Sequence, residues 1–157
     1  MFNIVLFEPE IPANTGNIIR LSANAGVQLH LIKPLGFELD DKKLRRAGLD
    51  YHEWATIQLH ESLPDFLSTV QPKRLFALTT KGTKIYSEAK FEAGDTFFFG
   101  CETRGLPKET LEMIGENCLY LPMQPESRSL NLSNTVAILL YEAWRQVDFQ
   151  SAAVKMA

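Results

Sequence analysis

The sequence contains few cysteines and few histidines. Its 157 residues include two cysteines, Cys101 and Cys118, and three histidines, His30, His52 and His60. Two cysteines this far apart form neither a disulfide framework nor a thiolate metal site. The histidines fall in separate predicted elements without the spacing of metal ligands. We therefore expect no metal ion.

Long apolar runs and a surplus of basic residues are also lacking. No apolar run approaches the length of a membrane span, and residues 1–3 lead into a strand pattern without the layout of a signal peptide. We therefore expect a cytoplasmic protein with no membrane partner. The net charge of −3 argues against a globally basic nucleic-acid binder. The cluster Lys42, Lys43, Arg45 and Arg46 is more often a solvated helix face, but beside a pocket it would suit a polyanion.

The first part of the chain has the pattern of a β-α-β unit. Residues 3–7 form an apolar run typical of a buried parallel strand, residues 14–26 a helix, and residues 29–32 a second strand. This unit predicts an α/β fold, with a mostly parallel sheet and helices on both faces. We expect one domain at residues 1–150 and a loose tail at 151–157. Further helices are predicted at 41–47, 63–70 after a Ser62 cap, 107–114 and 132–147, and further strands at 55–59, 75–78, 96–99 and 118–121.

The turn Asn14-Thr15-Gly16-Asn17 opens the first predicted helix. It has one glycine, and it lacks both the dinucleotide fingerprint and the lysine of an ATP-binding loop, so it predicts neither an NAD site nor an ATP site. Arg20 follows within reach of a ligand at the carboxyl end of the first strand. The alternative is a surface arginine paired with Glu8 or Glu10.

Three late strands end in polar loops marked by glycine or proline, which begin at Leu78, Phe99 and Leu121. Ligands of open parallel sheets bind outside the carboxyl ends of the strands. Gly100 removes a side chain where a ligand would press against the backbone. Each loop alone would be an ordinary turn, but the three together predict a pocket.

The loop before the last helix carries more small polar residues than one helix cap requires. These residues are Ser127, Ser129, Asn131, Ser133 and Asn134. The surplus indicates a ligand with several polar edges. The helix itself is apolar over most of its circumference, which favours equally a contact with a second subunit and a central position in a monomer.

Three stretches resemble, in order, the motifs of SPOUT-superfamily RNA ribose 2′-O-methyltransferases. They are NTGNIIR at 14–20, FGCETRGLP at 99–107, and the segment 121–134 with LPM and SRSLNLSN. The stretch LRRAGLDYH at 44–52 and the lack of an added RNA-binding domain resemble the minimal, YibK-like tRNA (cytidine/uridine-34-2′-O)-methyltransferases. Cys101 stands where that family more often has proline, which should alter the stiffness of the loop.

The resemblance implies a deep trefoil knot in the C-terminal part of the sheet, a homodimer, and S-adenosylmethionine as methyl donor with S-adenosylhomocysteine as product. The substrate would be the ribose of wobble nucleotide C34 or U34 in the anticodon stem-loop of a tRNA. The implied cofactor contacts are Leu78, Thr79, Gly100, Leu121, Met123, Ser129 and Leu130.

The resemblance also implies roles for polar and charged residues. Arg20 would stabilise negative charge developing on the ribose oxygen and hold a neighbouring phosphate. Action of Arg20 as a general base is the less favoured alternative, because a guanidinium does not readily lose its proton. Asn14 would orient Arg20 or the ribose, and Glu102 would orient Arg20, face the cationic cofactor, or pair with Arg104. The implied RNA contacts are Arg45, Arg46, His52 and Tyr141.

Two other functions remain as alternatives. A hydrolase with Ser127 or Ser129 as nucleophile would lack both a nucleophile elbow and an assignable histidine base. A non-catalytic nucleotide- or RNA-binding dimer would keep the pocket without the chemistry.

Overall fold

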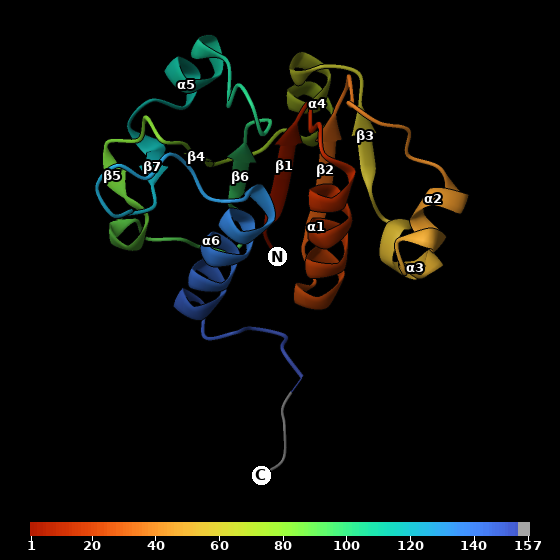
Figure 1. The fold of residues 1–157 in the computed structure, drawn as a ribbon. Coiled ribbons are helices and arrows are strands. Elements are labelled where there is room, and N and C mark those ends of the chain that lie inside the picture. The colour runs from red at the N-terminus through yellow and green to blue at the C-terminus, as the bar shows by residue number, and fades with distance from the viewer. Residues whose placement is uncertain (154–157) are drawn as a thin grey trace.

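The structure, a computed structural model, describes residues 1–153. One sheet of seven strands crosses the molecule with helices on both sides (Figure 1). The strands are β1 (Asn3–Phe7), β2 (Gln28–Ile32), β3 (Gln58–His60), β4 (Leu75–Leu78), β5 (Lys84–Ile85), β6 (Thr96–Phe99) and β7 (Cys118–Tyr120). The helices are α1 (Pro12–Ala25), α2 (Asp41–Arg46), α3 (Tyr51–Trp54), α4 (Leu63–Val70), α5 (Lys108–Ile114) and α6 (Leu132–Gln146), with 3-10 turns η1 (Tyr86–Glu88) and η2 (Gly115–Asn117). Within residues 1–153, no helix is long and apolar enough to cross a membrane.

The strand order is β3-β2-β1-β6-β4-β7-β5, and each pair of neighbouring strands is parallel. The chain begins in the middle of the sheet at β1, builds one half outward to β3, and then builds the other half. The register sets Leu78 of β4 opposite Phe99 of β6 and opposite Leu119 of β7. The carboxyl ends of these three strands are therefore level.

Two apolar cores cover the two faces of the sheet, because successive strand residues point to opposite faces. Ile4 and Leu6 of β1 join the core that holds α1 and α6, whereas Val5 joins the core that holds Phe66 of α4 and Ile114 of α5. All these side chains are buried. The predicted α/β class, with a parallel sheet and helices on both faces, is confirmed. The trefoil knot stays a prediction.

Several element boundaries differ from the sequence prediction. The strand predicted at 55–59 is wrong in its first half, because Ala55 and Ile57 donate backbone hydrogen bonds to the carbonyls of α3, at 2.9 and 3.2 Å. The sequence analysis missed α3 and the two-residue strand β5. Helix α1 begins earlier than predicted, with Pro12 in its first turn, where a missing N–H has no cost. Pro107 is the residue before α5 rather than its first residue.

Helix α6 buries the predicted apolar stripe, with Val136, Leu139, Leu140 and Ala143 in the core. After the end of α6 the chain folds back onto the last turn of the helix. The indole Nε1–H of Trp144 donates to the carbonyl of Gln150 at 3.0 Å. Of the tail predicted at 151–157, residues 154–157 lie outside the described part of the chain.

Candidate active site

A cavity of about 810 Å³ lies at the carboxyl ends of β4, β6 and β7. Its volume is within the range of roughly 300–1,000 Å³ that is usual for small-molecule and cofactor sites. The loop that follows β7 and the first turn of α6 form its remaining wall. All seven predicted cofactor contacts line it, namely Leu78, Thr79, Gly100, Leu121, Met123, Ser129 and Leu130. The three strand-end loops therefore do meet around one hollow.

Gly100 is required by the wall of the cavity itself. A Cβ atom at this position would lie 2.1 Å from the carbonyl carbon of Gly105 and 2.3 Å from the nitrogen of Leu106. The structure adds a second reason for glycine here, because the chain's own backbone is the close neighbour, and the expected ligand contact of Gly100 stays a prediction. Gly82, in the turn after β4, is a second close approach of two backbones, where a Cβ atom would lie 2.3 Å from the carbonyl carbon of Leu119.

Thr79 forms the turn after β4 with all of its polar groups. Its N–H donates to the carbonyl of Leu119 at 2.9 Å, its hydroxyl accepts from the N–H of Lys81 at 3.1 Å, and its carbonyl accepts from Gly82 at 3.1 Å. Since these groups hold the turn together, Thr79 contributes mainly shape to the cavity.

Part of the cavity wall is apolar and open. Met123 and Leu130 line it with 38% and 42% of their surface exposed, although both are large hydrophobic residues. Asn131 provides the cap of α6, where its side-chain oxygen accepts from the N–H of Ser133 at 2.9 Å. One residue therefore caps the helix, and the hydroxyls of Ser127 and Ser129 remain beside the cavity.

Glu102 lines the cavity and holds the loop between β1 and α1. Its carboxylate accepts from the backbone N–H groups of Glu10 and Ile11 at the start of α1. A second contact joins the same two loops, because the Glu10 carboxylate accepts from the N–H of Thr103 at 3.2 Å and from the Thr103 hydroxyl at 2.6 Å. These bonds, led by that of the Thr103 hydroxyl, lower the pKa of Glu10. The partners of Glu102 are thus backbone amides, whereas Arg104 lies 3.9 Å from Glu8.

Asn14 also lines the cavity, from the first turn of α1, and is only 5% exposed. The cavity therefore gathers two of the three predicted catalytic residues, Asn14 and Glu102.

Arg20 lies elsewhere, and it does not line the cavity. Its Nε–H donates to the carboxylate of Glu53 at 3.1 Å, and its guanidinium also donates to the carbonyl of Gly48. The alternative pairing with Glu8 or Glu10 is wrong, because the carboxylate partner of Arg20 is Glu53. Half of the Arg20 side chain is exposed.

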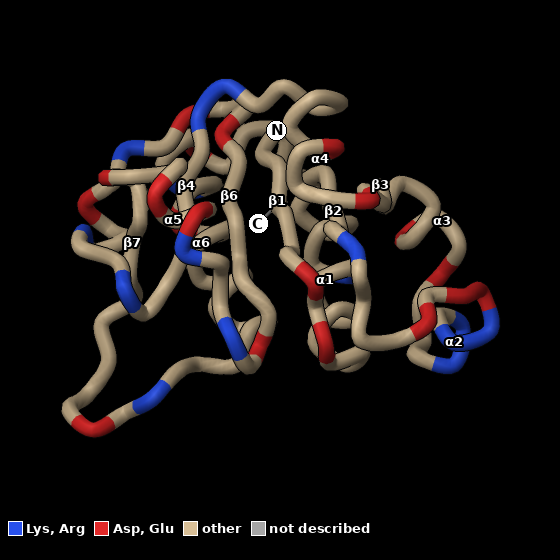
Figure 2. The backbone as a smooth tube through the Cα atoms, turned by 90° about the horizontal axis from the view of Figure 1, so that it is seen from above, with Lys and Arg blue, Asp and Glu red and all other residues tan. Residues whose placement is uncertain are grey.

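The predicted RNA contacts also lie away from the cavity. Arg45, Arg46 and His52 are exposed residues of α2 and α3. Figure 2 shows the basic residues of α2 on the opposite side of the molecule from β7. Tyr141 is 44% exposed on α6. The predicted residues thus separate into a cavity group and a group on the outer surfaces of α1, α2, α3 and α6.

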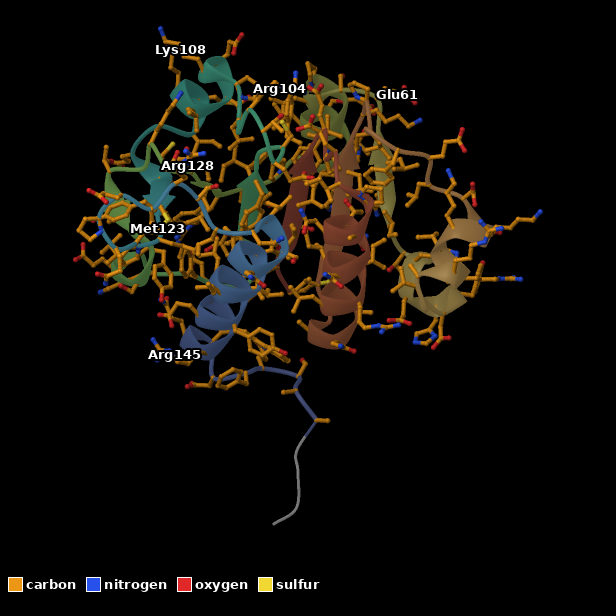
Figure 3. The ribbon with its side chains drawn as sticks, in the orientation of Figure 1. Glu61, Arg104, Lys108, Met123, Arg128 and Arg145 are labelled. Carbon is orange, nitrogen blue, oxygen red and sulfur yellow. The ribbon has the colours of Figure 1, made fainter. Side chains whose placement is uncertain are left out.

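The sequence analysis missed three basic residues that line the cavity, Lys81, Arg104 and Arg128. Arg104 and Arg128, labelled in Figure 3, belong to the loops after β6 and β7. A signal for them was present, because each of the three strand-end loops contains one cation. Together they make the rim of the cavity attractive to anionic groups.

The cavity does not suit a serine hydrolase. Ser127 and Ser129 line it, but no histidine of residues 1–153 is among the lining residues. In the same part of the chain, no group of three or more metal-ligating side chains lies together.

Comparisons with known proteins agree with this architecture. The family model described as "SpoU rRNA Methylase family" matches residues 1–141. A tRNA (cytidine(34)-2′-O)-methyltransferase of Saccharophagus degradans is 61% identical over 150 residues, which cover 95% of this chain and 97% of the relative.

Solved structures are similar as well. A crystal structure of a putative RNA methyltransferase from Bacillus anthracis superposes with a TM-score of 0.91 at 45% identity and covers 99% of this chain and 100% of its own. A structure concerned with the 2-OH methylation of C/U34 on tRNA has a TM-score of 0.87 at 44% identity, with 96% and 98% coverage.

Proposed function

The chain belongs to the SpoU rRNA Methylase family, and we propose from this premise that it methylates the ribose 2′-hydroxyl of nucleotide 34 in a tRNA. The resemblance drawn from its three motifs is confirmed by the family model and by the relatives. The protein is an enzyme, a tRNA ribose 2′-O-methyltransferase, like the relatives that match it over nearly their whole length. The observation that carries the proposal is the single cavity formed by the three strand-end loops.

The cavity fits S-adenosylmethionine as the methyl donor. Leu78, Leu121, Met123 and Leu130 offer apolar surface for an adenine ring, and the exposed parts of Met123 and Leu130 are surface that a bound ring would cover. Ser129 lies beside them to bond a polar edge. When bound, the cofactor supplies a methyl group already activated by a positively charged sulfur. The cationic rim would attract the cofactor's carboxylate or a neighbouring RNA phosphate.

The protein's part in the reaction is alignment and charge stabilisation. Asn14 at the cavity would orient the ribose. Arg20 would stabilise the negative charge that develops on the 2′-oxygen, since a guanidinium remains protonated and offers five donors. The proton of the hydroxyl passes to solvent or to a neighbouring phosphate rather than to Arg20.

We propose a homodimer in which the Arg20 of one chain completes the cavity of the other. Two observations support it. Arg20 is turned away from the cavity of its own chain, and α6 exposes Ile138 and Tyr141 on the side opposite its buried stripe, at 40% and 44%. Apolar side chains exposed next to each other on one helix favour a contact with a second copy. We also propose one domain for residues 1–150 and a cytoplasmic location.

Arg45, Arg46 and His52 would then hold the anticodon stem-loop, the arginines by phosphate contact and His52 by stacking on a base. Tyr141 would stack on a base with the part of its ring that the second copy leaves exposed. This arrangement does not require a basic protein overall, because the cations are gathered on α2.

The test is a methyl-transfer assay with unmodified tRNA and labelled S-adenosylmethionine, followed by mass mapping of the product. The expected result is one 2′-O-methyl group on nucleotide 34. Absence of label in RNA, with S-adenosylhomocysteine still bound, would favour the non-catalytic nucleotide- or RNA-binding dimer. A methyl group on another nucleotide would contradict the assignment of the substrate.

A further inference from the structure

Arg20 is held by a segment that belongs to the predicted RNA-binding surface. Its Nε–H donates to Glu53 Oε2 at 3.1 Å, and a terminal nitrogen donates to the carbonyl of Gly48. Gly48 lies between α2 and α3, and Glu53 lies in α3. The Arg20 guanidinium thus makes two hydrogen bonds to the α2–α3 segment (residues 41–54), which also contains Arg46 and His52.

Glu53 is suited to hold a guanidinium in one orientation. Its Oε1 accepts from the N–H of Asp50 at 2.8 Å, in a capping box that fixes the start of α3. Its Oε2 is left to receive Arg20, and the side chain is only 9% exposed. The Asp50 N–H bond, followed by the Arg20 contact, lowers the pKa of Glu53, so the carboxylate is charged at neutral pH.

Gly48 provides the second point of attachment through its backbone. Its backbone has a φ of +81°, in the left-handed region that glycine adopts without strain. Its N–H donates to the carbonyl of Arg45 at 3.0 Å. The orientation of the Gly48 carbonyl therefore depends on the end of α2, and any displacement of α2 moves the acceptor of Arg20.

The two attachments restrict an otherwise mobile side chain. Half of the Arg20 side chain is exposed, and a free arginine at such a site would sample many rotamers. With the Nε–H and one terminal N–H engaged, three of the five guanidinium donors are left for a substrate.

We propose that Glu53 is a positioning residue for Arg20, and that through it the α2–α3 segment couples RNA contact to the orientation of the guanidinium. This inference rests on the proposed function, because it gives Arg20 its task in methyl transfer. Glu53 is not among the residues that line the cavity. Its effect on the reaction therefore passes through Arg20.

The test variant is Glu53→Gln. Glutamine is accepted in the third position of a capping box, so the bond from Asp50 is retained while the charged contact with Arg20 is lost. We expect a fall of about 10- to 100-fold in the single-turnover rate with saturating tRNA, the scale of a misplaced catalytic group. The affinity for S-adenosylhomocysteine should stay within about threefold, because the cavity is unchanged.

Asp50→Ala is the matched control, because it removes the cap side chain at the same turn and leaves the Glu53–Arg20 contact in place. It should lower the melting temperature and leave the single-turnover rate near that of the wild type. A rate lost equally in Asp50→Ala and Glu53→Gln would assign the effect to the stability of α3 and overturn the proposal.

A double-substitution cycle separates positioning from a general structural role. In an Arg20→Lys background, Glu53→Gln should change the rate by less than about threefold, because the group it positions is already gone. A further fall of tenfold or more would overturn the proposal, and so would a wild-type rate for Glu53→Gln alone. Glu53→Asp, which keeps the charge, should be faster than Glu53→Gln, and an equal or slower rate would contradict the role of the carboxylate.

Failure of the proposed function and failure of the role of Glu53 give different results. If the wild-type protein does not methylate tRNA, the proposed function fails. If the wild-type protein methylates nucleotide 34 and the cycle shows independent effects, only the role of Glu53 fails.

Discussion

The cavity and the α2–α3 segment differ in how completely one chain builds them. The cavity is lined by three loops that are held by hydrogen bonds to backbone groups. The carboxylate of Glu102, for example, accepts from the backbone N–H groups at the start of α1. The α2–α3 segment is short, charged and exposed, and its link to α1 runs through Arg20 and Glu53. One chain therefore gathers the residues proposed to bind the cofactor around its own cavity, whereas Arg20 and the residues proposed to bind RNA lie outside that cavity. This difference is the basis of the proposal that a second copy completes the site.

The largest expected effect comes from removing Arg20. Arg20→Ala should lower the single-turnover rate of methyl transfer by about 10²–10³-fold, the usual cost of losing one group that stabilises transition-state charge. Binding of S-adenosylhomocysteine, measured by calorimetry, should stay unchanged because Arg20 does not line the cavity of its own chain. Loss of cofactor affinity in this variant would contradict the division between the two regions.

A substitution at Gly100 should disrupt the cavity. In Gly100→Ala the new Cβ atom would lie 2.1 Å from the carbonyl carbon of Gly105. The loop must shift, and we expect a loss of about 2–3 kcal/mol in the free energy of unfolding together with loss of cofactor binding.

Gly16→Ala is the matched control for Gly100→Ala, because a Cβ atom there has no neighbour within 4 Å. Since Gly16 lies inside α1, alanine should raise the free energy of unfolding by roughly 0.5–1 kcal/mol. Urea denaturation compares the two, and equal destabilisation would show that Gly100 is not a close backbone crossing.

The half of the sheet next to α2 and α3 should be the one that acid destabilises. His30 and His60 are buried, with His30 Nδ1 3.0 Å from His60 Nε2, and Asn3 and Asp65 are the other polar neighbours. Burial, with a smaller effect of His60, lowers the pKa of His30 to about 4. Burial also lowers the pKa of His60, against the opposing charge of Asp65.

The sign of the pH effect follows from these directions. Between an unfolded pKa of about 6.5 and the folded value the unfolded chain binds more protons, so the free energy of unfolding falls as the pH falls. The loss from His30 should reach up to about 3 kcal/mol near pH 4. Urea denaturation from pH 7.5 to 4.5 checks it, and a His30→Gln protein with an undiminished pH slope would contradict it.

The smallest effects concern the charges of the proposed RNA-binding surface on α2. Arg45→Gln combined with Arg46→Gln should weaken tRNA binding by about tenfold. The slope of log K for tRNA binding against log salt concentration should become shallower by roughly one unit per lost phosphate contact. Lys108→Gln on α5 is the control, because Lys108 is as exposed but lies on another helix. If salt weakened the binding of S-adenosylhomocysteine as strongly as that of tRNA, the two regions would not be distinct.

The sequence predicted the parts of the molecule that depend on local pattern. The apolar runs around Val5 and Phe98 identified buried parallel strands, and Asp40 and Ser62 cap α2 and α4 as polar residues before a helix should. The three strand-end loops predicted the place of the cavity, because parallel strands bring their carboxyl ends to one edge of the sheet.

Other features could not be read from the sequence, because they depend on contacts between distant segments. The pairing of Arg20 with Glu53 spans 33 residues, and the bonds of Glu102 to the start of α1 span more than 90. The crossing of Gly100 against Gly105 needs a three-dimensional path of the backbone. Strand β5 is two residues long, which is too short for any period to appear.

The central claim, that one chain's Arg20 serves the other chain's cavity, is tested most directly by mixing two inactive proteins. One carries Arg20→Ala, and the other carries Leu121→Trp, which fills the cavity with an indole. After dissociation and reassociation, random pairing of two-fold dimers should restore roughly a quarter of the wild-type methyl transfer, because half of the dimers would contain one complete site. Activity that stays at the level of the separate variants would contradict the claim.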